Sequence, residues 1–418
     1  MNKLKDVFYI YPWILIILAG PIIHNSQNLP FGWELPKVYF VVALCLVMLL
    51  FYIFDSLTSN FKLSTKHAFI LILVLYLIFV GFINQNQETI LLGSNYRKQG
   101  IITISVILVT LTITSKYLYI YHKTIIWTFI ISGLFQIPFV IENLNFILNS
   151  QSHFRKLLDG MYVFGSFGQS NFFAGHMLIG SLFSFYFVFF YKDLKLKILS
   201  ILTLFILSLC IILSYSIWAI LVLLFGMLVI FFYRYFRESM YTTAVASLLI
   251  FFSFNFVSIN ESLFKIFMNS PLGASFYSRF EYRKAFFEVY LNDFKLFLFG
   301  SGPDTLHIVL KANDKLPGII LDRTHDFFLD IAFVGGFILL AVFCLFWLKV
   351  SLKISKARRN NLIDVCFLIA NLWILRSLIH TSSIINLVEF GILVAVCSHY
   401  AFTSSPPSQY PKDSKHFE

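Results

Sequence analysis

Charged residues are scarce in this chain. Lysine, arginine, aspartate and glutamate make up 13% of its 418 residues and hydrophobic residues make up 58%, whereas soluble domains average about 25% charged residues. This balance excludes an ordinary soluble protein and predicts an integral membrane protein built mainly of spanning helices. The formal net charge of +11 then points to anionic lipid head groups and cytoplasmic loops. We therefore expect membrane lipids as partners and no nucleic acid.

Cysteines and metal-binding motifs are also sparse. The five cysteines lie inside apolar runs, and none forms a C-x-x-C pair. We therefore interpret them as small hydrophobic residues with no disulfide or metal role. They are Cys45, Cys210, Cys344, Cys366 and Cys397. The chain has no H-E-x-x-H or D-x-D signature, no glycine-rich phosphate loop and no Ser-His-Asp order. We therefore expect no metal and no cofactor, and a serine hydrolase or an ATPase has no support.

Long apolar runs dominate what the chain does contain. A spanning helix needs about 20 mainly apolar residues, and the sequence predicts about twelve such segments. Their expected bounds are 8–23, 36–54, 67–84, 99–115, 122–141, 171–191, 196–214, 216–233, 241–257, 326–348, 361–379 and 384–402. The seventh and eighth meet at residues 214–216, as a tight hairpin or as one broken element. The expected fold class is an all-α polytopic membrane protein with about twelve transmembrane helices and one long external loop between spans nine and ten.

The distribution of lysine and arginine orients the chain in the membrane. An even number of spans places both termini on one side, and every short loop on that side holds at least two of these residues. They are Lys3, Lys5, Lys62, Lys66, Lys116, Lys123, Lys192, Lys195, Lys197, Arg234, Arg237, Lys349, Lys353, Lys356, Arg358 and Arg359. By the positive-inside rule the termini are cytoplasmic. The long polar segment 258–325 then lies outside the cytoplasm.

We expect two parts in the domain organisation. Residues 1–402 form the transmembrane helical bundle, with the external loop 258–325 inserted. Residues 403–418 are polar and rich in proline and serine, which predicts a disordered cytoplasmic tail. Charged residues are nearly absent from the middle of the apolar runs, where a transporter would place them. The pattern therefore disfavours a multispan transporter.

Cations on the outer side are informative because that side carries few of them. Arg279 and Arg283 lie four residues apart in a segment with helical periodicity, so they share one face. Two neighbouring guanidiniums need an anion or carboxylates between them, and the planar fork of arginine suits phosphate. The alternative for Arg283 is pairing within its own helix, with Glu288 nearby. Further outer-side cations are Arg97, Lys98 and Arg323.

The segment 322–330, DRTHDFFLD, combines a cation, a histidine and carboxylates at the mouth of an apolar run. His325 among charged neighbours suggests a group that moves a proton. Asp326 is expected to cap the following helix, where its charge meets the positive helix end. Asp326 and Asp330 offer the alternative of a metal site, which we do not favour because no metal signature surrounds them. Asp330 should face protein or a water-filled cavity.

Two glycine-containing segments predict loops. Gly165 and Gly168 mark a loop before span six, with the amides of Gln169 and Asn171 at its rim. Neutral donors and acceptors beside apolar surface fit a sugar site, and helix capping by Asn171 is the alternative. The Gly-Ser-Gly-Pro sequence at 300–303 predicts a turn in preference to amides exposed to an oxyanion.

Three of these segments together resemble the O-antigen ligase superfamily. GSFGQSNFFA at 165–174 resembles the family pattern G-x-F-G-Q-P-N-x-x-A, and 279–303 resembles its arginine, amphipathic helix and G-x-G-P turn. DRTHDFFLD at 322–330, followed by two glycines, is similar to D-R-A-H-N-x-x-L-D. The superfamily contains lipopolysaccharide O-antigen ligases, O-antigen polymerases and O-linked protein-glycosylation ligases.

The resemblance implies a glycosyltransferase of the bacterial inner membrane whose active site faces outside the cytoplasm. The implied reaction is a metal-independent, inverting transfer of a glycan from an undecaprenyl-pyrophosphate carrier to an acceptor hydroxyl, with no cofactor. The implied partners are the lipid-linked glycan donor and a hydroxyl on a glycolipid, a glycan or a protein.

The resemblance also implies roles for particular residues. Arg279 would hold the pyrophosphate, and His325 would accept the proton of the acceptor hydroxyl or orient that hydroxyl, so these two are the expected catalytic residues. The expected substrate-binding residues are Arg283, Arg323, Arg97, Lys98, Gln169, Asn171 and Asp326.

Two positions depart from the family pattern. Asp326 follows His325 where the family usually has asparagine, and Ile217 follows Ser216 where the family often has arginine. One phosphate-binding arginine is therefore missing. Either Arg323 or Arg376 replaces it, or the activity is altered.

Three functions compete at this point. A ligase would use lipid A core or a protein hydroxyl as acceptor. A polymerase for O-antigen, capsule or exopolysaccharide would use another lipid-linked repeat unit. A multispan polysaccharide transporter, from a different functional class, is the third candidate.

Cysteine labelling tests the expected orientation. A cysteine introduced at residue 313, in the long outer loop, should react with an impermeant maleimide added to intact cells. A cysteine at residue 355, in a cation-rich cytoplasmic loop, should react only after permeabilisation, because that side is expected to face the cytoplasm. Labelling at 355 but not at 313 in intact cells would contradict the orientation.

Overall fold

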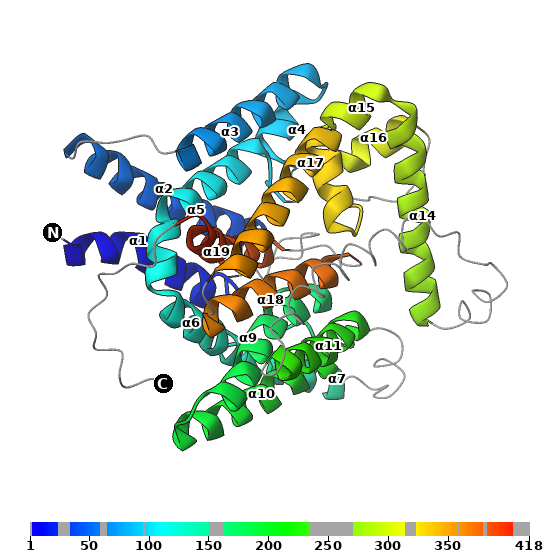
Figure 1. Cartoon of the computed structure of the whole chain (residues 1–418). Coiled ribbons are helices and arrows are strands. Elements are labelled where there is room, and N and C mark those ends of the chain that lie inside the picture. Colours follow the sequence, from blue (N-terminus) through cyan, green and yellow to red (C-terminus); the bar gives the residue numbers. More distant parts are fainter. Residues whose placement is uncertain are drawn as a thin grey trace.

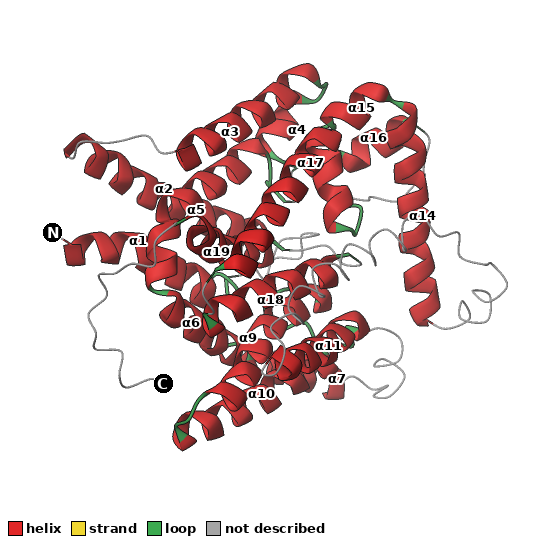
Figure 2. Ribbon diagram, viewed as in Figure 1, coloured by secondary structure: helices red, strands yellow, loops and turns green. Residues whose placement is uncertain are grey.

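The computed structural model describes residues 2–23, 34–58, 65–94, 97–149, 163–233, 271–313, 323–357, 360–378 and 383–403, and of residues 2–4, 58, 65–66, 271–278 and 280 only the backbone. Throughout these ranges the regular structure is helical and contains no strand (Figure 2). The apolar composition of the runs leaves every backbone N–H and C=O to be satisfied within its own segment, which a helix in lipid achieves.

The helices keep the order of the predicted apolar runs. The first group is α1 (Asn2–Ala19), α2 (Glu34–Thr58), α3 (Thr65–Ile83), α4 (Gln87–Leu92), α5 (Ile101–Ile120), α6 (His122–Leu134) and α7 (Ile137–Asn149). The second group is α9 (Ser170–Phe190), α10 (Leu194–Leu213), α11 (Ile217–Tyr233), α14 (Pro271–Asn292), α15 (Phe294–Phe299) and α16 (Leu306–Ala312). The last group is α17 (Phe327–Lys356), α18 (Asn361–Ser377) and α19 (Ile384–Phe402).

The polytopic all-α fold class is confirmed. Among the described residues, 7 helices are long and apolar enough to cross a membrane, and His67–Ile83 and Ile217–Tyr233 are shorter apolar helices. Each predicted span inside the described ranges coincides with a helix, whereas 241–257 and the tail from 404 lie outside them. The number of twelve spans and the domain bounds stay predictions.

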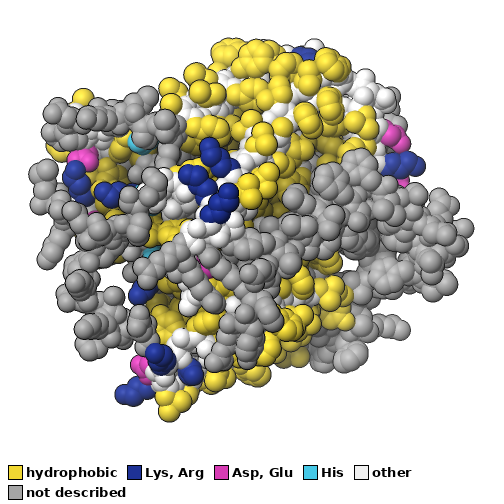
Figure 3. Space-filling model, in the orientation of Figure 1, with side chains coloured by type: hydrophobic (Ala, Val, Ile, Leu, Met, Phe, Trp, Pro, Cys, Tyr) yellow, Lys and Arg dark blue, Asp and Glu magenta, His cyan; other side chains and the backbone are white. Residues whose placement is uncertain are grey.

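The molecular surface is apolar over broad areas. Leu50, Phe54 and Leu57 on α2 are 66%, 64% and 82% exposed. In the face shown in Figure 3 hydrophobic side chains cover most of the described surface, and lysine and arginine gather in a few groups. Exposed apolar area of this extent is unfavourable in water and favourable against lipid, which agrees with the membrane fold class.

Polar contacts sort the helix ends into two sets. At one end, here called the Lys5 end, Lys5 of α1 forms an ion pair with Asp55 of α2 at 2.6 Å. At the other, here called the Glu34 end, the backbone N–H of Ile384, which begins α19, donates to Glu34, which begins α2, at 3.1 Å. Tyr117 of α5 stacks on Tyr9 of α1, and Tyr119 of α5 stacks on His399 in the last turn of α19, so the described chain starts and finishes at the Lys5 end.

One helix, α9, is central to the bundle. In its spanning window 83% of residues are buried inside the protein, compared with 28% in α10. Its neighbours include α6, α10, α11 and α18, and Figure 1 shows the surrounding arrangement. The loop 165–169, which leads into α9, is therefore held at the centre of the Glu34 end.

The described part of segment 258–325, here called the outer segment after its predicted location, is helical. Helices α14, α15 and α16 lie together at one edge of the bundle beside α17 (Figure 1). The helix predicted around Arg279 and Arg283 is confirmed, because both residues lie on α14. These three helices bring the outer segment onto the Glu34 end, where α17 begins.

Helix α17 is interrupted at Gly335 and Gly336. Their backbone angles are non-helical, and Gly336 has φ 69°. A Cβ at Gly336 would lie 2.0 Å from the carbonyl oxygen of Leu298. The hydroxyl of Tyr76 donates to the carbonyl of Gly335 at 2.6 Å. The predicted span 326–348 coincides with the candidate span Phe327–Lys356, and the two glycines divide it into a short helical piece before the break and a longer one after it.

The Gly-Ser-Gly-Pro turn at 300–303 docks on this break. The N–H of Ser301 donates to the carbonyl of Phe333 at 2.8 Å, and the N–H of Gly302 donates to that of Val334 at 3.1 Å. A helix break leaves carbonyls without intrahelical donors, and the turn supplies them. The interpretation as a turn is confirmed, because these amides face protein carbonyls.

Substitution of Gly336 tests the importance of the break. Gly336→Ala should lower the apparent melting temperature of the purified protein, because a positive φ and a close backbone oxygen both disfavour a side chain and cost more than about 1 kcal/mol. Gly81→Ala is the matched control, since its Cβ would approach no backbone atom and would lie 3.2, 3.6 and 3.9 Å from methyl groups of Ile101, Ile90 and Leu91. Equal melting temperatures for the two variants would contradict this account.

Candidate active site

The loop before α9 is shaped by two glycines in the left-handed region. Gly165 has φ 54° and Gly168 has φ 72°, where side chains are disfavoured. Helix α9 begins at Ser170, with Gln169 at the N-cap position and no side-chain cap. The capping alternative for Asn171 is therefore wrong, and its Oδ1 instead accepts a hydrogen bond from Ser216 Oγ at 2.9 Å. Gln169 is partly exposed at the rim of the loop.

Ser166 anchors this loop to two other helical segments. Gln136 Oε1 accepts hydrogen bonds from Ser166 N at 3.1 Å and from Ser166 Oγ at 2.8 Å. Lys37 Nζ donates to the Ser166 carbonyl at 3.0 Å and lies 4.5 Å from the centre of the Phe167 ring. The sequence reasoning missed Lys37 and Gln136. A lone lysine at the start of an apolar run, on the side with few cations, was the available signal for Lys37.

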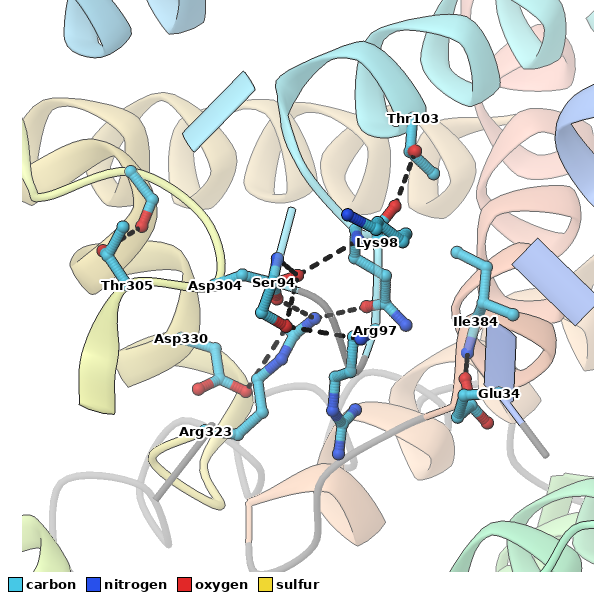
Figure 4. Close-up of polar contacts among 12 residues, drawn as sticks. Glu34, Ser94, Arg97, Lys98, Thr103, Asp304, Thr305, Arg323, Asp330 and Ile384 are labelled. Atoms are coloured by element: carbon cyan, nitrogen blue, oxygen red, sulfur yellow. Dashed lines mark hydrogen bonds and ion pairs between the residues drawn. The ribbon is translucent and has the colours of Figure 1, made fainter. Parts of the chain in front are cut away.

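Arg97 and Lys98 are adjacent in the sequence, but their side chains point in different directions. Arg97 is 2% exposed and lies 5.7 Å from the centre of the Phe172 ring, next to the loop before α9. Lys98 has φ 51°, and its side chain points away from that of Arg97 (Figure 4). Of the two, Arg97 is therefore placed beside α9.

The guanidinium of Arg323 contacts three polar side chains, those of Gln99, Asp304 and Asp330. Its Nη2 donates to Gln99 Oε1 and lies 3.8 Å from Asp304, and its Nη1 lies 4.0 Å from Asp330 (Figure 4). Asp304 also accepts hydrogen bonds from the backbone N–H groups of Ser94 and Gln99 at 3.1 and 3.0 Å. Arg323 therefore ties the 94–99 loop to the start of α17. No pattern in the sequence indicates Asp304 or Gln99 as partners of Arg323.

Asp326 and Asp330, the two described aspartates of segment 322–330, bind different groups. Asp326 is the N-cap of α17 and accepts from the N–H groups of Phe328 and Leu329 at 2.9 and 3.2 Å, so the predicted cap is confirmed. Asp330 accepts from Thr324 N at 2.9 Å and from Thr324 Oγ1 at 2.8 Å. Its side chain faces protein and the small pocket that also includes Arg323. The two carboxylates are thus engaged by different groups.

Arg279 and Arg283 of α14 share a partly desolvated environment. Arg283 Nη2 lies 3.5 Å from Asp326 and donates to the carbonyl of Leu378. Burial lowers the pKa of Arg283, an effect that Asp326 opposes. Burial, and then the like charge of Arg283, lower the pKa of Arg279 to about 10. Arg279 has no hydrogen bond or ion pair with the residues described here. A charged donor in this setting favours an anion as its partner.

His325 lies beside the same face of α14. Its ring centre is 6.0 Å from that of Tyr282, which follows Arg279 by three residues on α14. His325 has φ 60°, a conformation that costs about 1–3 kcal/mol and persists where neighbouring structure imposes it. Asp326 next to it holds Arg283. The structure therefore brings His325, Arg279, Arg283 and Asp326 together.

The end of α18 connects this group with the first turn of α9. Arg376 donates from Nη2 to the carbonyl of Asn171, and two residues later the carbonyl of Leu378 accepts from Arg283. Arg376, rather than Arg323, is thus the arginine near Ser216, whose Oγ binds Asn171.

Buried charges inside the spans correct one expectation from the sequence. His176 of α9 is 1% exposed and Glu389 of α19 is 1% exposed. His176 Nδ1 contacts Glu389, and its Nε2 lies 3.1 Å from Ser132 Oγ. The absence of a Ser-His-acid order in the sequence thus did not exclude this spatial chain. Ser132 donates to the carbonyl of Ile17, so its proton is not directed to His176 as in a hydrolase.

The N-cap and the ion pair of Asp326 can be separated by substitution. Asp326→Asn and Asp326→Ala both remove the charge beside Arg283, but only asparagine keeps a capping oxygen. The alanine variant should therefore be less stable by about 1 kcal/mol than the asparagine variant in an unfolding titration. The same pair of substitutions at Asp293, the N-cap of α15, provides the control for capping alone. Equal stability of the two Asp326 variants would contradict the cap.

Comparison with known proteins matches a part of the chain that includes α14 and the His325 segment. The model of the O-antigen ligase family matches residues 202–344. No curated protein and no solved structure matches the chain. The matched range contains α14, α15, α16 and the His325 segment, whereas the loops at 97–98 and 165–174 precede it. Residues 202–344 therefore match the O-antigen ligase family, and the resemblance of the chain to the O-antigen ligase superfamily is confirmed.

Proposed function

We propose that this protein transfers a glycan from an undecaprenyl-pyrophosphate carrier to an acceptor hydroxyl at the outer face of the bacterial inner membrane. The observation that carries the proposal is the arrangement around α14. Arg279 has no acceptor among the described residues, Arg283 lies next to it, and His325 lies across Tyr282. The site provides positive charge and a base at one place.

The two arginines fit the chemistry of the leaving group. Pyrophosphate already leaves with low basicity, so the main need is stabilisation of the negative charge that develops as the glycosidic bond breaks. Arg283 is held in place by Asp326 at 3.5 Å, and Arg279 is left to bind phosphate oxygens. An arginine donates two parallel hydrogen bonds to such oxygens, which also fixes their orientation.

His325 supplies the group that takes up the acceptor proton. As the C–O bond to the acceptor forms, the hydroxyl proton passes to the imidazole, while the electron pair of the breaking bond stays on the pyrophosphate. Asp326 caps α17 directly after His325, which fixes the position of the imidazole beside α14. Holding donor and acceptor together beneath α14 supplies the effective concentration.

Ligase and polymerase use the same site, and the acceptor distinguishes them. Deletion of the gene should reveal which applies, through the lipid-linked glycan that accumulates. Accumulation of long polymerised chains on the carrier would assign a ligase, because polymerisation is then complete. Accumulation of single repeat units would assign a polymerase.

Transfer from a purified lipid-linked donor tests the roles of the two proposed catalytic residues. His325→Ala should lose about two to four orders of magnitude in rate, which is the usual contribution of a general base. Arg279→Lys should also lose much of the rate although it keeps the charge, because an ammonium does not reproduce the arginine fork. The assay measures glycan release from the carrier in detergent, with and without EDTA.

Two neighbouring residues provide matched controls for this assay. His307 lies on α16 in the same outer segment, and Lys284 is exposed on α14. His307→Ala and Lys284→Ala should keep nearly full activity. Full activity of His325→Ala would remove the proton-acceptor role, and loss of wild-type activity in EDTA would replace the metal-free mechanism.

A further inference from the structure

Another arginine with unused donors lies at the Glu34 end, outside the α14 group. Arg376, in the last turn of α18, is 0% exposed. Its Nη2 donates to the carbonyl of Asn171, whereas Nε and Nη1 have no acceptor in the described part of the chain. Buried guanidinium groups normally have their hydrogen bonds satisfied, because an unmet charged donor is costly. An unmet pair of donors therefore indicates a missing acceptor.

The nearest acidic side chain does not supply that acceptor. Glu389 is the carboxylate whose charge acts on Arg376, but its Oε1 contacts His176 and its Oε2 accepts from Asn386 at 3.2 Å. Within the described residues no ion pair joins Glu389 to Arg376. Glu389 thus offsets the charge of the guanidinium while leaving Nε and Nη1 free.

The surroundings of Arg376 hold it firmly against the head of α9. A Cβ at Gly175 would lie 2.7 Å from Arg376 Cζ, so the guanidinium packs where only glycine leaves room. The last turn of α18 is fixed to α11, because Trp218 Nε1 donates to the carbonyl of Leu375 at 3.0 Å. The donors of Arg376 are therefore positioned by α9, α11 and α18.

Arg376 is also close in sequence to a contact of the proposed catalytic group. The carbonyl of Leu378, two residues further on, accepts from Arg283, and Arg283 lies beside Asp326 and Arg279. At the end of α18, Arg376 therefore contacts the first turn of α9, and Arg283 of α14 contacts Leu378. An anion with several oxygens bound at this end can meet cations from both sides.

We propose that Arg376 binds phosphate oxygens, and that in the working enzyme these belong to the pyrophosphate of the lipid-linked donor. This assignment rests on the proposed function. Nε and Nη1 donate the charge-assisted hydrogen bonds, and Glu389 keeps the empty site electrically balanced. Because the guanidinium is buried, entry of the anion requires movement of the first turn of α9, which contains Asn171. Phospholipid head groups carry the same chemistry, so the test has to separate the two sources.

Binding measurements on the purified full-length chain test the proposal. Undecaprenyl pyrophosphate is titrated in detergent and followed by intrinsic tryptophan fluorescence, and phosphatidylglycerol and inorganic pyrophosphate are titrated in parallel. Loss of hydrogen bonds to a charged group should weaken undecaprenyl pyrophosphate binding by roughly 10- to 100-fold in Arg376→Met. Arg376→Lys, which keeps the positive charge beside Glu389, should weaken it by roughly tenfold.

Ser216→Ala is the matched control, because it removes the hydrogen bond to Asn171 Oδ1 but no charge. Its affinity for undecaprenyl pyrophosphate should stay close to that of the wild type. Thermal unfolding of each variant is recorded first, and if Arg376→Met does not fold, the comparison is made on Arg376→Lys. Unchanged affinity in a folded Arg376 variant overturns the proposal.

Two further outcomes distinguish the binding site at Arg376 from the proposed glycan transfer. Equal loss of phosphatidylglycerol and undecaprenyl pyrophosphate binding in the variants would assign the site to lipid head groups and overturn the donor assignment. Arg376-dependent binding of undecaprenyl pyrophosphate without any glycan transfer by the wild type would support the binding site while rejecting the proposed function.

Discussion

The cost of burying arginine organises the Glu34 end of this bundle. Arg283 and Arg376 are both removed from solvent, and each finds a backbone carbonyl at a helix end or in a loop. A buried charge that loses its partner is strongly destabilising, so these contacts fix α14 and the head of α9 against the end of α18. The outer helices and the central helix are thereby held in one arrangement, although they come from distant parts of the sequence.

The interrupted helix α17 is the second constraint on the site. Gly335 and Gly336 break the helix and leave carbonyls that the turn at 300–303 satisfies. The short helical piece before the break presents His325 and Asp326 at its start. Because α15 packs on α17, the same break sets where the outer segment returns to the bundle. Structure and proposed chemistry therefore depend on two adjacent glycines.

Arginines that look equivalent in the sequence differ in how many of their donors have partners in the structure. Arg323 is occupied by Gln99, Asp304 and Asp330, which makes it a tie between two loops. Arg279 is left without an acceptor among the described residues, and Arg376 keeps two unused donor atoms. An arginine already paired with carboxylates has less attraction for an added anion than one that is not. This difference, and not the count of cations, supports the proposed placement of the donor phosphates.

The sequence by itself determined the features that depend on local patterns. Hydropathy predicted the helices, periodicity predicted α14, and the aspartate before an apolar run predicted the cap at Asp326, because each follows from residues close together in the chain. Only the tertiary structure decided which distant residues meet. Lys37 reaches Ser166, 129 residues away, and His176 reaches Glu389, 213 residues away. Helix packing sets these pairings, and a single sequence contains no local signal for them. The same holds for Arg376, whose position beside Asn171 and Ser216 follows from how α18 lies against α9 and α11.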